Sequence, residues 1–255
     1  MSTVTMRQML EAGVHFGHRT SRWNPKMRPY IFTSRNGVHV IDLAQTKSML
    51  DEALDAIRDA VASGEKVLFV GTKKQAQDVI REVCDATGQH YVVNRWLGGM
   101  LTNYPVMRQR VRRLQELREL KERGDFERMS RKEANVHQDE LTRLESNFGG
   151  LATMDARPGV LFVIDCKRES LAVKEANTLS IPIYAIVDTN CDPDKVEYVI
   201  PGNDDSMRAI SLILTAVQGA IEEGMELQRK RKAEASVRET SGSEKAVAVA
   251  QGGEA

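Results

Sequence analysis

The sequence predicts an α/β protein with a doubly wound, mostly parallel sheet of the Rossmann or flavodoxin type, arranged in three layers. Short apolar runs at residues 67–70, 160–164 and 183–187 are continuous, which is typical of strands covered on both faces. Amphipathic segments alternate with these runs, as expected where helices pack on both faces of a sheet. Alternation and continuous apolar runs together therefore predict the fold class.

The individual elements are expected in the following order. Thr5 should cap a short helix that buries Met6, Met9 and Leu10 and stops at Gly13. Further strands are expected at 38–43, 67–70, 91–93, 160–164, 183–187 and 198–200. Further helices are expected at 44–63, 74–87, 169–179 and 205–222, each with apolar residues at intervals of three and four.

The alternation is interrupted once, where residues 105–148 read as two charged helices joined near Gly124. Their apolar stripes are narrow and consist of Met107, Val111, Leu114, Leu117 and Leu120, then His137, Leu141, Leu144 and Phe148. Helices lying flat on the sheet would need wider apolar faces, so the stripes favour an inserted antiparallel coiled-coil hairpin. We expect a sheet domain with an N-terminal arm (1–104 and 149–227), this hairpin (105–148) and a disordered tail (228–255).

Composition limits the possible functions. The 255 residues carry no net charge, which argues against a simple polycationic nucleic-acid binder. Residues 1–113, however, hold 17 Lys+Arg against 10 Asp+Glu, leaving 19 against 26 in the remainder. The first part of the chain therefore has an excess of positive charge and the remainder an excess of negative charge.

Three widely spaced cysteines offer neither a disulfide framework nor a zinc ribbon. With no leader and no apolar stretch that could span a bilayer, we expect a soluble cytoplasmic protein.

The segment from residue 15 to 31, here called the arm, combines positive charges with aromatic rings. Its cations are Arg19, Arg22, Lys26 and Arg28, and its rings include Phe16, Trp23 and Tyr30. Gly17, Pro25 and Pro29 predict a bent loop rather than a helix or a strand interior. The cations can neutralise phosphates while the rings stack on bases. The alternative is an arm that only packs on its own domain, anchored by its rings.

A doubly wound sheet raises the possibility of a nucleotide-binding enzyme, but the expected glycines are missing. The turn at residues 69–74 follows a strand and opens a helix, yet it contains one glycine and matches no phosphate-cradle motif. Its Thr72, Lys73 and Lys74 would suit one lone phosphate, such as a nucleic-acid backbone phosphate. In the glycine-containing segment 95–103, Trp96 is as well suited to packing as to stacking.

Acidic residues gather after the later strands, where an enzyme of this fold would hold a metal or substrate. They are Asp188, Asp192, Asp194, Asp204 and Asp205. Turn chemistry explains most of them, with Asp204 or Asp205 expected to cap the last helix. An ion site formed by His18, Asp188 and Asp205 is the alternative, but we expect no metal and no cofactor.

Several blocks of the sequence resemble the family of bacterial small-subunit ribosomal protein S-two. They are Met6–His18 with the motif His15-Phe16-Gly17-His18, Trp23–Met27, Phe69–Lys73, Arg95–Asn103, Pro158–Asp165 and Pro201–Asp205. These blocks occur in order and without gaps over residues 3–225. The resemblance implies a non-enzymatic structural constituent of the small ribosomal subunit that supports translation. It also implies binding to small-subunit (16S) ribosomal RNA and to neighbouring ribosomal proteins, and recruitment of the large messenger-binding first protein of the subunit.

We therefore expect a ribosomal RNA-binding protein with no small-molecule substrate and no membrane contact. The predicted contacts are Arg19, Arg22, Trp23, Lys26, Arg28, Lys73, Lys74, Arg95, Arg108, Arg110, Arg112 and Arg113. One alternative is a phosphate- or nucleotide-binding enzyme that uses the strand ends near Thr72, Asp165 and Asp188. A second is a protein-only scaffold built on the hairpin.

Overall fold

A five-stranded parallel sheet forms the centre of the molecule in the computed structural model, which describes residues 4–251 and treats 235–251 only as helix. Its strands are β4 (Val67–Val70), β5 (His90–Val92), β6 (Val160–Ile164), β7 (Ile183–Val187) and β8 (Tyr198–Pro201). They are arranged in the order β5-β4-β6-β7-β8, which is the flavodoxin-like order. The order in which successive strands are added reverses between β4 and β6, because β5 lies on one side of β4 and β6 lies on the other. Proteins of this fold class bind their ligands at such a switch point.

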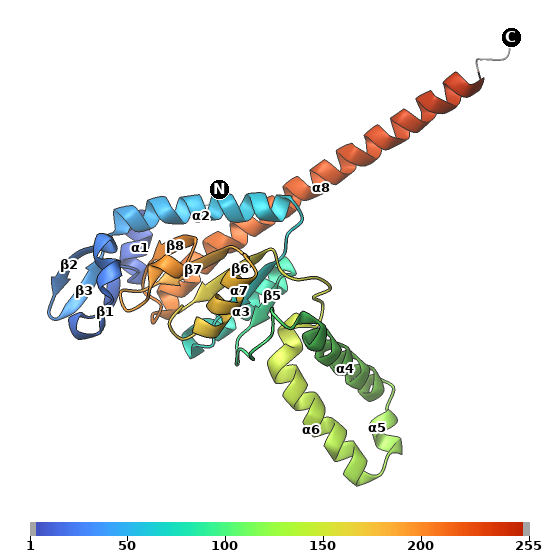
Figure 1. Ribbon diagram of the computed structural model, residues 1–255, viewed down its shortest axis with the longest axis horizontal. Helices are drawn as coiled ribbons and strands as arrows, with labels where there is room; N and C mark the ends of the chain where they lie inside the picture. The colour runs from blue at the N-terminus through green and yellow to red at the C-terminus, as the bar shows by residue number, and fades with distance from the viewer. Residues whose placement is uncertain (1–3, 252–255) are drawn as a thin grey trace.

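Helices cover both faces of this sheet, which confirms the predicted α/β class (Figure 1). They are α1 (Met6–Ala12), α2 (Leu43–Ala62), α3 (Lys74–Thr87), α7 (Ser170–Thr178) and α8 (Met207–Gln251). Phe69 and Phe162 pack into the core beneath α2, α3 and α8, whereas Leu68 and Val163 pack on the α7 side. Every residue of β4, β6 and β7 is buried, as their continuous apolar sequences require.

The first helix has the predicted caps, but of the three apolar residues that it was expected to bury, only Met9 is buried, whereas Met6 and Leu10 are exposed. The Thr5 side chain accepts from the backbone N–H of Gln8, and the Gln8 side chain accepts from the backbone N–H of Thr5. Gly13 ends the helix with a φ of +77°, a left-handed conformation that favours glycine.

The arm is more regular than predicted. It contains β1 (Phe16–Arg19) and two short 3₁₀ helices, η1 (Thr20–Arg22) and η2 (Pro25–Tyr30), and leads into β2 (Ile31–Arg35) and β3 (Val38–Ile41). The three strands form a separate antiparallel sheet in the order β1-β3-β2. The expectation of a loop without helix or strand was wrong, because β3 supplies a pairing partner and Pro25 occupies the first position of η2.

Between β5 and β6 lie α4 (Tyr104–Glu122), α5 (Asp125–Arg128), α6 (Arg131–Phe148) and η3 (Gly149–Leu151), which extend away from the sheet (Figure 1). The buried side chains of α4 and α6 are Met107, Val111, Leu114 and Leu117, with Leu141, Leu144 and Phe148. These lie in the predicted stripes, while Leu120 and His137 are half-buried. Arg113 Nη2 lies 3.0 Å from Glu140 Oε2 and links α4 to α6.

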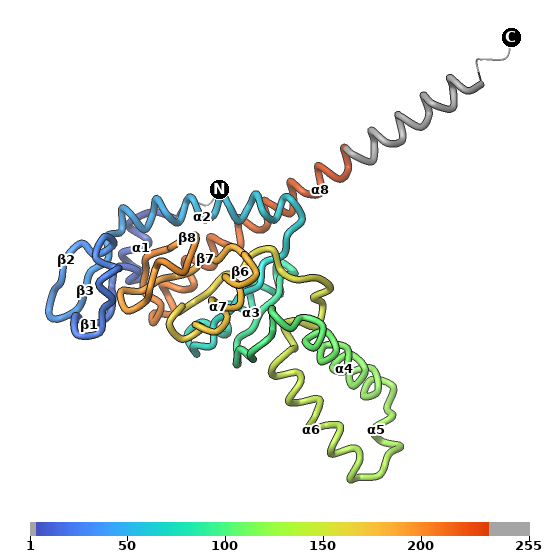
Figure 2. Tube along the Cα trace, in the orientation of Figure 1, coloured from blue at the N-terminus to red at the C-terminus, as the bar shows by residue number. Residues whose placement is uncertain are grey.

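The last helix is longer than the sequence indicated. α8 continues past residue 222 to Gln251. Its N-terminal part packs along α2 (Figure 2). Residues 229–234 are exposed helix formers, and the predicted tail at 228–255 falls largely outside the residues described in full. The prediction that Asp204 or Asp205 caps this helix was wrong. Asn203 Oδ1 instead accepts from the backbone N–H of Ser206, and Ser206 Oγ accepts from the backbone N–H of Ala209. Among the residues searched, no helix is apolar over a length that would cross a membrane.

Candidate nucleic-acid interface

The arm is fixed to the carboxyl-terminal edge of the parallel sheet by the loop after β7. Thr189 Oγ1 accepts from the backbone N–H of His18 at 2.8 Å, and the Thr189 carbonyl accepts from that of Asn24 at 2.7 Å. Gly17 permits this approach, because a Cβ there would lie 2.6 Å from the Thr189 side chain. The arm is therefore docked beside β7 rather than free.

His18 joins the arm to two carboxylates at the same edge. Its Nδ1 lies 2.9 Å from Asp188 Oδ2, and its Nε2 lies 3.3 Å from Asp205 Oδ2. The hydrogen bond with Asp188 raises the pKa of His18, which outweighs the opposing effect of burial. The structure thus brings together the three residues that the sequence offered as an alternative ion site.

Lys73, predicted to contact RNA, lies buried at the strand switch point. Its ammonium is 2.8 Å from Asp165, 2.6 Å from Asp204 and 2.8 Å from Asp205. Burial alone would lower the pKa of Lys73, but the carboxylates raise it well above the ordinary value. An ammonium has three N–H donors, so each can be directed at one carboxylate. Contact between Lys73 and RNA stays a prediction, and it would require these pairs to be given up.

The turn before α3, where a nucleotide phosphate would bind, is occupied by an internal carboxylate. Glu169 Oε1 accepts from the backbone N–H of Thr72 at 3.0 Å and from its hydroxyl at 2.5 Å. Arg168 Nε donates to the same hydroxyl oxygen at 2.7 Å. Burial raises the pKa of Glu169. Both Thr72 donors, which a phosphate in this turn would need, are therefore already engaged within the chain.

Two overlapping groups of side chains have the spacing of metal ligands. They are His18, Asp188 and Asp204, and Asp165, Cys191 and Asp204, with the ligand atoms of each group within 4.8 Å of one another. Asp204 Oδ2 is buried and has no hydrogen-bond partner in the described part of the chain, and burial raises the pKa of Asp204 to about 7. Imidazole and carboxylate ligands suit zinc, but the Lys73 ammonium already supplies positive charge here. The expected absence of a metal stays a prediction.

The predicted cations of the arm differ in whether they form ion pairs within the chain. Arg19, Arg22 and Arg28 are exposed and form no ion pair with any residue that the structure describes. Lys26 lies 3.1 Å from Asp192 Oδ1 and 2.6 Å from Asp194 Oδ2. Trp23 is half-buried, with its ring centroid 5.1 Å from that of His39.

The predicted cations near α4 are mostly free. Arg95, Arg108, Arg110 and Arg112 are exposed without an ion pair among the described residues, as is Lys74 at the start of α3. Arg113 instead pairs with Glu140 and Glu116. The arm lies near β7 and β8, while α4 lies beyond β5, so the free cations form two separate groups (Figure 1).

Sequence reasoning missed Glu175 as the organiser of the loop that leads into α4. Its carboxylate accepts from the Trp96 indole N–H and from the backbone N–H groups of Gly99, Leu101 and Thr102 at 2.8–3.1 Å. Burial raises the pKa of Glu175, but these donors outweigh burial and lower it. Trp96 is thus a buried anchor rather than a stacking platform. The sequence signal that could have identified this role is the position of Glu175, an acidic residue among the apolar positions of α7.

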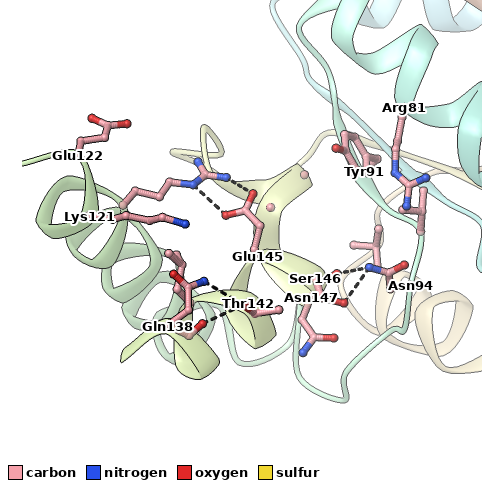
Figure 3. Close-up of a pocket in the computed structure, with 16 residues that line it drawn as sticks. Arg81, Tyr91, Asn94, Lys121, Glu122, Gln138, Thr142, Glu145, Ser146 and Asn147 are labelled. Carbon is pink, nitrogen blue, oxygen red and sulfur yellow. Dashed lines mark hydrogen bonds and ion pairs between the residues drawn. The ribbon is translucent and has the colours of Figure 1, made fainter. Parts of the chain in front are cut away.

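A large cavity of about 750 Å³ separates the edge strand β5 from α4 and α6 (Figure 3). Its polar side chains are largely engaged with one another: Arg118 pairs with Glu145, and Asn94 donates to Ser146 Oγ at 3.0 Å. Arg81 pairs with Asp78 at 2.8 Å. Arg118, Asn94 and Arg81 are therefore already engaged, whereas Lys121 and Glu122 have no ion-pair partner among the described residues (Figure 3).

Comparison with known proteins gives one consistent result. Residues 9–224 match the family described as Ribosomal protein S2. The "Small ribosomal subunit protein uS2" of Roseiflexus sp. (strain RS-1) is 53% identical over 231 residues, or 91% of this chain and 88% of that protein. Those of Petrotoga mobilis and Roseiflexus castenholzii are 52% and 55% identical, covering 89% and 87% of this chain and 78% and 84% of theirs. The chain belongs to the Ribosomal protein S2 family, a family of structural, non-enzymatic proteins of the small ribosomal subunit.

Proposed function

We propose that this protein is held in the small ribosomal subunit by direct binding to small-subunit (16S) ribosomal RNA. The observation that supports this most strongly is the set of exposed arginines without internal partners. They are Arg19, Arg22 and Arg28 in the arm and Arg95, Arg108, Arg110 and Arg112 near the start of α4. Arginine pairs well with phosphate because its planar guanidinium matches two phosphate oxygens.

The two groups of arginines lie at different ends of the sheet, so one protein can contact two stretches of RNA backbone (Figure 1). Lys74 adds a free cation at the start of α3. Lys26, Lys73 and Arg113 belong to the same proposed interface, but each must first exchange a carboxylate partner for a phosphate. We expect these three to contribute less than the free arginines.

The helices α4 to α6 act, in this proposal, as an inserted antiparallel hairpin that reaches neighbouring RNA and proteins. Their extension beyond β5 and their charged outer faces support this role. Among neighbouring proteins, the resemblance to the family points to the large messenger-binding first protein of the subunit, which this chain would help to recruit during translation in the cytoplasm. Small subunits assembled without this chain should then lack that protein and regain it when the chain is added back.

The nucleotide-enzyme alternative gains no support from the site. Glu169 engages both donors of Thr72 in the turn before α3, and the Lys73 ammonium is enclosed by three carboxylates. Both groups would have to leave their partners before a nucleotide phosphate could bind there.

Binding of the purified full chain to small-subunit ribosomal RNA over a salt series tests the proposal. We expect the affinity to fall as salt rises, because each phosphate contact releases counterions. Large-subunit ribosomal RNA of similar length serves as the control and should bind more weakly. Equal binding to both RNAs, or no binding at moderate salt, would contradict specific binding to small-subunit RNA.

A further inference from the structure

A second groove, distinct from the cavity at β5, lies at the carboxyl-terminal edge of the sheet. It is lined by residues 22–25 of the arm, by the segment that opens α7, and by the loop between β7 and the 3₁₀ helix η4 (Pro193–Lys195). Its volume is about 500 Å³. Sites for small ligands typically measure about 300–1,000 Å³, so the groove has room for one small molecule or one nucleotide of a longer chain.

The groove carries an excess of positive charge. Arg22, Lys167 and Lys195 line it, and Asp192 is its one lining carboxylate. Asp192 already accepts from Lys26 and lies 3.8 Å from the Lys195 ammonium, while Arg22 and Lys167 pair with no carboxylate among the described residues. Two free cations therefore face a space that holds no free acid from the described chain. This charge balance suits a phosphate group.

The walls also offer a flat aromatic surface and a free amide. Trp23 lines the groove and is only half-buried, although it contacts His39 elsewhere. Asn190 Oδ1 accepts from the Cys191 thiol at 3.2 Å, which leaves its amide N–H₂ group without a partner in the described chain. A stacking ring beside free amide donors is how proteins hold an unpaired base.

The floor of the groove does not repel an anion. It is formed by Cys166, Val173 and Cys191, all buried. Burial raises the pKa of the Cys191 thiol to about 12 and that of Cys166 well above its ordinary value. Both thiols are therefore neutral near pH 7. The first residue of α7, Ser170, also lines the groove, so the positive end of the helix dipole adds to the attraction.

We propose that this groove binds one unstacked nucleotide of RNA, with its base against Trp23 and its flanking phosphates against Arg22, Lys167 and Lys195. The proposal rests on RNA binding as the proposed function, and it adds a site that Lys167 and Lys195 complete. It explains why the arm is fixed so closely to the loop after β7: Thr189 holds the backbone on either side of Trp23, at His18 and Asn24.

Tryptophan fluorescence of the full chain gives a direct test. The chain has two tryptophans, and Trp96 is buried against Glu175, so quenching by a ligand reports on Trp23. Single-stranded hexauridylate should quench the emission, and Trp23→Phe should abolish the quenching. Uridine monophosphate, a blunt RNA duplex and hexaglutamate are the comparison probes. Equal binding by any of these three would overturn an unstacked nucleotide of RNA as the occupant.

Variants separate the groove from RNA binding in general. In filter binding, Trp23→Ala should weaken the complex with small-subunit RNA about 5- to 150-fold, whereas Trp23→Phe should retain most of the affinity. The double variant Lys167→Gln/Lys195→Gln should lower the log–log salt slope by about 1.4, because two single-strand phosphate contacts are lost. Lys174→Gln/Lys230→Gln removes two exposed charges outside the groove and should change the slope little.

The outcomes distinguish the two proposals. If the wild-type chain binds small-subunit RNA and the groove variants bind with wild-type affinity and slope, the groove proposal is wrong while RNA binding stands. If the wild-type chain itself does not bind this RNA, the proposed function fails. Circular dichroism of each variant checks that it is folded. If Trp23→Ala does not fold, the lysine variants still test the groove.

Discussion

Neutralising the free arginines at the start of α4 should weaken RNA binding in a way that depends on salt. The perturbation is Arg108→Gln/Arg110→Gln/Arg112→Gln, three exposed residues without ion pairs among the described residues. If each contacts one phosphate, the slope of log K against log salt should fall by about 2.1–2.7 in total, or about 0.7–0.9 per contact. The loss should be similar for every RNA sequence that the chain binds.

Two controls make this measurement specific. Arg113→Gln should leave the slope nearly unchanged, because its guanidinium already pairs with Glu140 and Glu116, and should instead weaken the packing of α4 on α6. Arg229→Gln/Lys230→Gln/Arg231→Gln removes three exposed charges from α8 and corrects for the change in net charge. Filter binding over a salt series is the assay. A triple arginine variant that binds with the wild-type slope would show that this face of α4 is merely solvated.

Three further predictions follow from the structure. Glu175→Gln should lower the free energy of unfolding in urea by about 2–3 kcal/mol, since an amide N–H₂ would face backbone donors, while the exposed Glu197→Gln should have little effect. Because the folded-state pKa of Glu175 is lowered, its contribution is complete above about pH 4.3 and should disappear as pH falls through the lowered value, a loss absent from Glu175→Gln. Calorimetry should detect no micromolar binding of ATP or NAD, and saturable binding abolished by Lys73→Met would count against the account. Deleting residues after Gln228 should leave the melting temperature nearly unchanged, because residues 229–234 are exposed, and a fall of many degrees would show docking of the tail.

The sheet was predictable from sequence because its strands are buried on both faces. The continuous apolar runs at β6 and β7 gave the strand limits directly, since few polar residues are tolerated there. The buried face of α4 could also be predicted from the sequence, because its apolar residues occur at helical spacing: Met107, Val111, Leu114 and Leu117. These patterns are local consequences of which face is buried.

The arm and the charged cluster were harder to predict because their partners are distant in sequence. The three-stranded sheet depends on the pairing of β1 with β3. Gly17 and Pro25 are typical of loops, so the sequence indicated a bent loop instead of this sheet. Lys73 appeared free for RNA, yet Asp165, Asp204 and Asp205 reach it from two other loops. Asp204 and Asp205 were misread as caps for the same reason. Residue type indicated positive charge correctly, but only the fold decides which charges stay unpaired.

The central claim, that this chain functions as an RNA-bound constituent of the small ribosomal subunit, is tested most directly by sedimentation. Cell extract is separated on a sucrose gradient and each fraction is probed for this chain. The account predicts that the chain is found with the small subunit and moves to the top of the gradient after ribonuclease treatment. A chain that stays at the top without ribonuclease would contradict it.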